Sequence, residues 1–187
     1  MTKAQKIAST LIEEGNKARA HFQVWWALRN KSLPKYYETM NDSSYVDFFH
    51  VSNSGHYTLF LLSLAKIFDR DSRVAGIQKF KQALCTEGMN ELAESLSQAL
   101  APYQDTVENV MRIRNKSVAH NEHSITREDV YRLNGVTPNE LQMLIDAACQ
   151  AINETSRELG INNLIFDGNR AEKATFNMLK ALSKGRK

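Results

Sequence analysis

The chain has 187 residues, of which 42% are hydrophobic and 24% are charged. These proportions suit a single folded domain over residues 1–187 and exclude a disordered chain, while only three prolines and eight glycines favour long helices. The formal net charge of +3 is too small to attract a nucleic acid by itself. Any anionic partner must therefore be bound by a local cluster of basic side chains.

The sequence shows no targeting or membrane segment. Its longest apolar cluster, Leu59–Ala65, is interrupted by Ser63, followed by Lys66 and far too short to cross a bilayer. The polar N-terminus predicts no signal peptide. Cys85 and Cys149 lie far apart without metal-ligand spacing, so we expect both to be small buried hydrophobes in a reducing compartment. The chain is predicted to be cytoplasmic, without membrane, metal or disulfide.

In the first half of the chain, apolar residues recur at steps of three and four, which is typical of amphipathic helices. Residues 4–30 predict a first helix, and Pro34 suits the first turn of a short second one. Turn-forming residues at 41–44 precede the most apolar pattern, at 46–69, which we place at the centre of a bundle because apolar residues surround its later half. Residues 76–85 predict another short helix.

The second half begins with the longest pattern, Asn90–Val118, in which Pro102 predicts a kink. Thr137–Glu140 combines a helix cap, a first-turn proline and a capping-box glutamate; the helix that it opens should end at Gly160. A last helix is predicted over residues 171–182. Because no segment alternates with the period of a strand, we expect an all-α bundle of five or six helices.

The densest group of chemically active side chains lies at the end of the longest pattern, in residues 111–123 (MRIRNKSVAHNEH). Arg114 can bind a phosphate through two hydrogen bonds, and Asn115 can donate to a phosphate oxygen or orient an imidazole. His120 can exchange protons near neutral pH. Together these are the parts of a metal-free phosphodiesterase, in which an RNA 2′-hydroxyl attacks its own phosphate while the arginine stabilises the developing charge.

The spacing of these residues complicates a site built by one chain. On an unbroken helix, His120 lies roughly 120° around the axis from Arg114, so the two side chains do not share a face. Either the helix breaks before His120, or a symmetric dimer assembles the site from two chains. The alternative is structural: the basic last turn complements the helix dipole, and His120 is a polar cap.

The motif Arg114-Asn115, four further residues and His120 resembles the signature of the HEPN superfamily. Combined with Leu64–Asp71 (LAKIFDRD), it is similar to the AbiU-like abortive-infection group. The resemblance implies an HEPN-like helical domain, often a homodimer, that cleaves RNA without metal or cofactor. It also implies that Arg114 and His120 are catalytic with Asn115 in support.

The same resemblance implies a role in toxin–antitoxin or phage-defence systems, with a cognate antitoxin protein as a partner. Some members of the superfamily instead bind RNA or a nucleotide without cutting it. A non-catalytic regulatory module is therefore the alternative function.

The supporting candidates for the site are Asp69, Arg112, Lys116 and His123. A carboxylate at a helix end and a histidine in a polar loop also have ordinary structural explanations. His50 and His56 are six residues apart, which is not the spacing of a helical metal pair, so we expect them to be structural. Trp25 and Trp26 could stack on bases, but their apolar stripe favours a place in the core.

Overall fold

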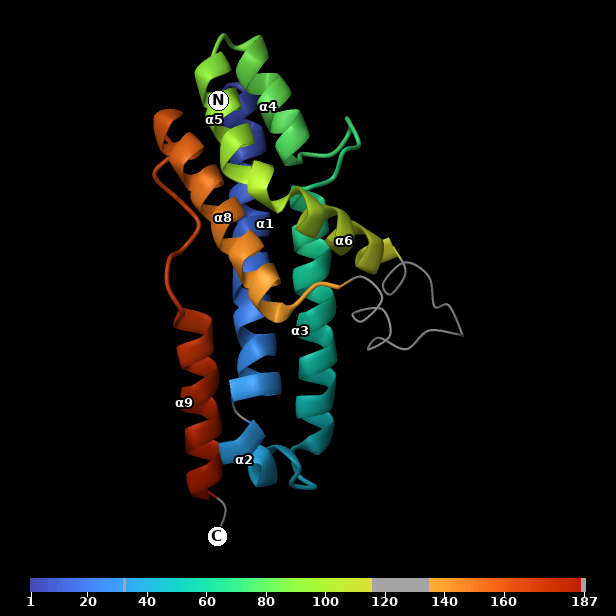
Figure 1. The fold of residues 1–187 in the computed structure, drawn as a ribbon. Helices are drawn as coiled ribbons and strands as arrows, with labels where there is room; N and C mark the ends of the chain where they lie inside the picture. The colour runs from blue at the N-terminus through green and yellow to red at the C-terminus, as the bar shows by residue number, and fades with distance from the viewer. Residues whose placement is uncertain (32, 116–134, 186–187) are drawn as a thin grey trace. The chain divides into compact units, whose positions relative to one another are not determined.

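The computed structural model describes residues 1–31, 33–115 and 135–185, which form helices and no strand and so confirm the all-α prediction (Figure 1). The helices are α1 (Lys3–Trp26), α2 (Leu33–Met40), α3 (Val46–Ile67), α4 (Ile77–Thr86), α5 (Asn90–Leu100), α6 (Gln104–Arg114), α8 (Pro138–Glu158) and α9 (Arg170–Gly185). They exceed the five or six predicted, in part because the pattern predicted over Asn90–Val118 is divided into α5 and α6.

The residue contacts divide the chain into two compact units, each of which takes one part of α1 and of α3. The first unit comprises Met1–Ala18 and Leu61–Phe166, and the second comprises Arg19–Phe60 and Asp167–Lys187. The single domain over residues 1–187 stays a prediction.

In the first unit, α4 packs on α5, while α5 and α6 pack on α8. The apolar positions predicted from the periodicity face inward; the largest buried side chains of these helices include Phe80, Leu84, Leu96, Ile113, Leu141, Leu144 and Ile145. Burying each such side chain stabilises the fold by roughly 1.5–3 kcal/mol. This core holds α6 in place, and α6 carries the candidate site.

The ends of α8 are as predicted. The Thr137 hydroxyl accepts a hydrogen bond from the Glu140 N–H at 3.2 Å, and the Glu140 carboxylate accepts one from the Thr137 N–H at 2.7 Å. This capping box pairs backbone donors that the first helical turn leaves without partners. Gly160, with φ of +74°, follows the helix in a left-handed conformation that favours glycine.

The predicted kink at Pro102 is a complete break. The helix stops at Leu100, a short 3₁₀ turn covers Ala101–Tyr103, and α6 begins at Gln104. Proline lacks an N–H and is tolerated at the start of a helical turn but not in a helix interior. The second helix can therefore leave in a direction of its own.

Two predictions about burial are wrong. Cys85 is exposed, although Cys149 is buried as expected. The buried face of α4 is formed by Ile77, Phe80, Ala83 and Leu84, and the helical turn carries the next residue away from it. Leu59 of α3 is 45% exposed, so apolar residues in the later half of α3 are not buried on all sides.

The second unit contains two apolar groups. α2 packs against α9. The first group is a core cluster of buried residues, namely Leu28, Tyr36, Met40, Phe49 and Leu179. Trp25, Phe22, Tyr57 and Phe60 form a group of ring contacts between α1 and α3. Trp25 is buried, as the sequence pattern predicts.

The connection that follows α8 is attached to this helix by one buried amide. The Asn153 side chain donates to the Ile165 carbonyl at 2.9 Å and accepts from the Ile165 N–H at 2.8 Å. Both residues are almost completely buried. Asn153 thus satisfies two backbone groups that would otherwise lose their hydrogen bonds to water without replacement.

We expect Asn153→Ala to lower the free energy of unfolding by about 2–4 kcal/mol, because it leaves the N–H and carbonyl of Ile165 buried and unpaired. Urea denaturation followed by circular dichroism measures the loss. Asn162→Ala, at an exposed asparagine of the same connection, is the matched control and should change stability by less than about 0.5 kcal/mol. Equal losses in the two variants would contradict this role.

Candidate functional site

The candidate site lies at the C-terminal end of α6. Ile113 is fully buried, Arg112 and Asn115 are exposed, and Arg114 is half-buried. The buried isoleucine determines which way its neighbours point, since successive helical residues are about 100° apart. Arg114 and Asn115 therefore lie at the edge of the core, where both side chains are accessible to solvent.

The guanidinium of Arg114 donates from Nη1 to the amide oxygen of Asn115 at 2.9 Å. An asparagine amide has one acceptor oxygen and two N–H donors, and this contact uses the oxygen. The NH₂ of Asn115 and the other N–H groups of Arg114 are all donors, so the pair is suited to binding an anion. Of the predicted catalytic residues Arg114, Asn115 and His120, the structure therefore shows the first two in contact.

A second group of charges connects α6 to the segment that follows α3. The carboxylate of Glu108 lies 3.8 Å from the Arg70 guanidinium and 3.8 Å from that of Arg112. All three side chains are exposed, so each ion pair contributes at most about 1 kcal/mol. The group has two positive charges and one negative charge, and it keeps a net charge of +1.

This contact brings together two blocks of sequence that are far apart in the chain. Arg70 belongs to Leu64–Asp71, and Arg112 belongs to the basic stretch that ends α6. Sequence reasoning did not identify Arg70 or Glu108 as members of the site. The spacing of four residues between Glu108 and Arg112 was the available signal, because such residues are neighbours on a helix.

Asp69 has a local structural role. Its carboxylate accepts a hydrogen bond from the Asp71 N–H at 2.9 Å, which closes the turn after α3. Asp71 in turn accepts hydrogen bonds from the side chain and then the backbone N–H of Arg73, which lower the pKa of its carboxyl. The turn places Arg70 next to Glu108. An orienting role of Asp69 in catalysis stays a prediction.

The remaining predicted members of the site, Lys116, His120 and His123, lie outside the described residues. Within the residues that are described, no group of three or more histidine, cysteine or acidic side chains could hold a metal ion.

The all-α fold and the motif in the sequence fit a helical protein of the HEPN class. The family model for AbiU2, an HEPN family, matches residues 1–173, which include both Leu64–Asp71 and the stretch from Arg114 to His120. The chain belongs to the AbiU2 family of the HEPN superfamily. No curated protein and no solved structure matches the chain. None of the described helices is both long and apolar enough to span a membrane.

A pair of histidines lies in the second unit. His21 of α1 and His56 of α3 approach through their Nδ1 atoms at 2.8 Å, so one nitrogen must donate and the other accept. Burial, and after it the charge of His21, lowers the pKa of His56 from its ordinary value of 6.5. His50 is exposed on the same helix. The contact of His56 agrees with the structural role expected for it.

The lowered pKa of His56 predicts how stability depends on pH. Below pH 6.5 His56 binds a proton more readily in the unfolded chain than in the folded chain. The free energy of unfolding should therefore fall as pH decreases from 6.5 through the pKa of His56 in the folded chain. We expect a lower urea midpoint at pH 5.5 than at pH 7.5. This interval lies above the titration of the carboxyl groups, whose ordinary pKa values are 4.5 or lower.

His56→Gln should reduce this difference between the two pH values, since glutamine can hydrogen-bond but does not titrate. His50→Gln removes an exposed histidine from the same helix and should retain the wild-type difference. If both variants keep the full difference in urea midpoint between pH 5.5 and pH 7.5, His56 does not cause that difference.

Proposed function

We propose that this chain is a metal-independent endoribonuclease that acts in an abortive-infection or toxin–antitoxin system. Membership of the AbiU2 family supports the class of activity. The observation that carries the proposal to particular residues is the hydrogen bond between Arg114 and Asn115 at the end of α6, which leaves N–H donors of both groups without a partner among the residues that the structure describes. A phosphodiester of RNA is an anion that such donors can bind.

In the proposed reaction, the imidazole of His120 removes the proton of an RNA 2′-hydroxyl, and the oxygen attacks the adjacent phosphorus. The bond from phosphorus to the 5′-oxygen breaks, and a proton is returned to that leaving oxygen. The products are a 2′,3′-cyclic phosphate and a free 5′-hydroxyl. Arg114 and Asn115 donate to the non-bridging oxygens, where negative charge develops in the transition state.

The neighbouring cations extend the surface that RNA could contact. Arg70 and Arg112 are exposed and share one carboxylate, so each can turn to a phosphate flanking the cleaved one. In single-stranded nucleic acid, each phosphate contact changes the slope of log affinity against log salt by roughly 0.7. These arginines would thus contribute to binding in a salt-dependent way and leave the bond cleavage to the motif.

The site is proposed to form between two copies of the chain. On an unbroken helix, Arg114 and His120 face different directions, and a twofold axis would bring the two motifs into one basic cleft. A cognate antitoxin protein is the further partner that we propose, since a toxic ribonuclease must be neutralised in its host.

We expect the purified protein to cleave single-stranded RNA in the presence of EDTA and to leave cyclic phosphate ends. Arg114→Ala and His120→Ala should each reduce the cleavage rate by about 100-fold or more, because they remove transition-state charge stabilisation and proton transfer. Gel analysis of a labelled RNA measures cleavage, and filter binding of the same RNA separately measures affinity.

The matched controls are Arg157→Ala, at an exposed arginine of α8, and His50→Ala, at an exposed histidine of α3. Both should retain the wild-type rate. Cleavage that requires a divalent metal, or full activity of His120→Ala, would contradict the mechanism. RNA binding that depends on Arg114 without any cleavage would instead support a non-catalytic regulatory module.

A shared site also predicts the state of the protein in solution. Sedimentation equilibrium should give a mass of twice the 21.3 kDa of one chain. Cleavage per mole of protein should fall on dilution below the dissociation constant of the dimer, because a single chain would have an incomplete site. A protein that is monomeric at concentrations where it is fully active would exclude the shared site.

A further inference from the structure

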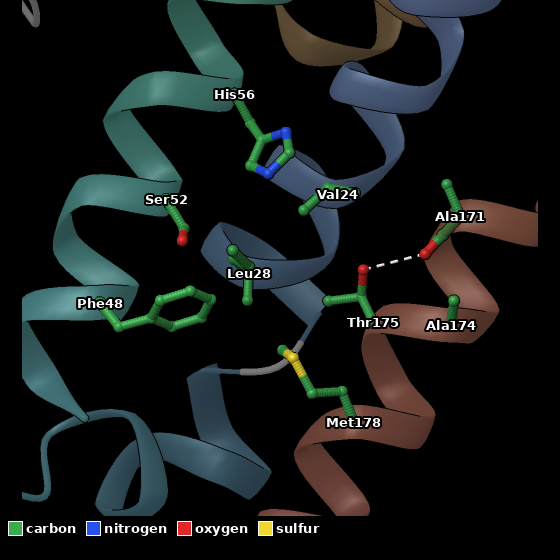
Figure 2. A pocket seen from close by; sticks show the side chains of 9 residues that line it. All are labelled: Val24, Leu28, Phe48, Ser52, His56, Ala171, Ala174, Thr175 and Met178. Atoms are coloured by element: carbon green, nitrogen blue, oxygen red, sulfur yellow. Dashed lines mark hydrogen bonds between the residues drawn. The ribbon is translucent and has the colours of Figure 1, made fainter. Parts of the chain in front are cut away.

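The second unit contains a cavity of about 310 Å³ between α1, α3 and α9 (Figure 2). The cavity is open to solvent on one side, since Phe48 in its wall is 58% exposed and Ala174 is also exposed. This volume is at the lower end of the range for small-molecule binding sites. Most of its wall is apolar and is formed by Val24, Leu28, Phe48, Ala171, Ala174 and Met178. None of its described lining residues is charged. Its chemistry therefore differs from that of the cationic end of α6.

Three polar side chains line the cavity, and they are not equivalent. The hydroxyl of Thr175 donates to the Ala171 carbonyl at 2.9 Å, so its proton is used within α9. The hydroxyl of Ser52 has no hydrogen-bond partner among the residues that the structure describes. His56 uses Nδ1 to bond His21, which leaves its other ring nitrogen for the cavity.

The bond to His21 holds the His56 ring in one orientation. The two ring centroids are 5.0 Å apart and their planes are inclined by 49°. In Figure 2, the second nitrogen of the His56 ring points toward Leu28, one of the residues that line the cavity. Because the bond to His21 orients the ring before any ligand arrives, a hydrogen bond from this nitrogen would require little further ordering.

We propose that this cavity binds an uncharged, mainly apolar small molecule that carries one hydrogen-bonding group, such as a phenol. The apolar wall would cover the hydrocarbon part, and the His56 nitrogen, with Ser52 beside it, would hydrogen-bond the polar group. A charged ligand would lose part of its hydration and find no opposite charge among the described lining residues. This site is separate from the proposed ribonuclease residues.

Three naphthalene compounds of similar shape test the ligand class by equilibrium dialysis against the full-length protein at pH 7.5. We expect saturable binding of 2-naphthol at one site per chain. Naphthalene should bind up to about tenfold more weakly, because it lacks the hydrogen bond. The anion 2-naphthoate should bind more weakly still. Tighter binding of 2-naphthoate than of 2-naphthol, or no saturable binding of 2-naphthol, would overturn the proposal.

Two variants test the location. His56→Leu should remove the preference for 2-naphthol over naphthalene while retaining the binding of naphthalene. Ala174→Phe should weaken the binding of both, because the ring would occupy part of the cavity. Ala181→Phe, at an exposed position of α9 outside the cavity, is the control and should bind like the wild type. Circular dichroism verifies that each variant is folded. Unchanged binding in both His56→Leu and Ala174→Phe would place the ligand elsewhere.

Discussion

The candidate site depends on the burial of one face of α6. Ile113 is fully inside the core of the first unit, where α6 packs on α8, and this anchors the last turn of the helix. Arg114 and Asn115 follow directly, so their positions are set by a hydrophobic contact in which neither takes part. Their hydrogen bond of 2.9 Å uses the amide oxygen of Asn115 and leaves the remaining N–H groups of the pair as donors. An apolar interaction thus determines where a polar site is presented.

The break at Ala101–Tyr103 contributes to the same arrangement. Without this break, α5 and α6 would form one straight helix. With it, α6 runs in a different direction from α5 (Figure 1). On this course Glu108 comes within 3.8 Å of Arg70, in the turn that Asp69 closes after α3. The exposed ion pairs are too weak to determine the fold. They form where Leu64–Asp71 and the end of α6, the two blocks that resemble the family, come into contact because the core brings them together.

The two units have polar features of different kinds. At the end of α6, two cationic side chains are accessible to solvent, since Arg112 is exposed and Arg114 is half-buried. In the second unit, a histidine pair adjoins an apolar cavity, and burial disfavours the charged form of His56. The first arrangement is the one proposed to bind RNA, and the second is the one proposed to bind a neutral molecule. The same residue type, histidine, is predicted to act by proton transfer in one and by hydrogen bonding in the other.

The sequence by itself determined the helical class, the starts and ends of most helices, the capping box at Thr137 and the family. The first three features depend on periodicity and on contacts between residues close in the chain, whereas the family was indicated by a resemblance of motifs. Only the tertiary structure decided that Cys85 is exposed, that Glu108 joins Arg70 to Arg112 and that His21 meets His56. His21 and His56 are 35 positions apart in the chain, and no local sequence pattern predicts that folding will bring them into contact. Long-range contacts of this kind follow from how the helices pack, and the packing is a property of the whole core.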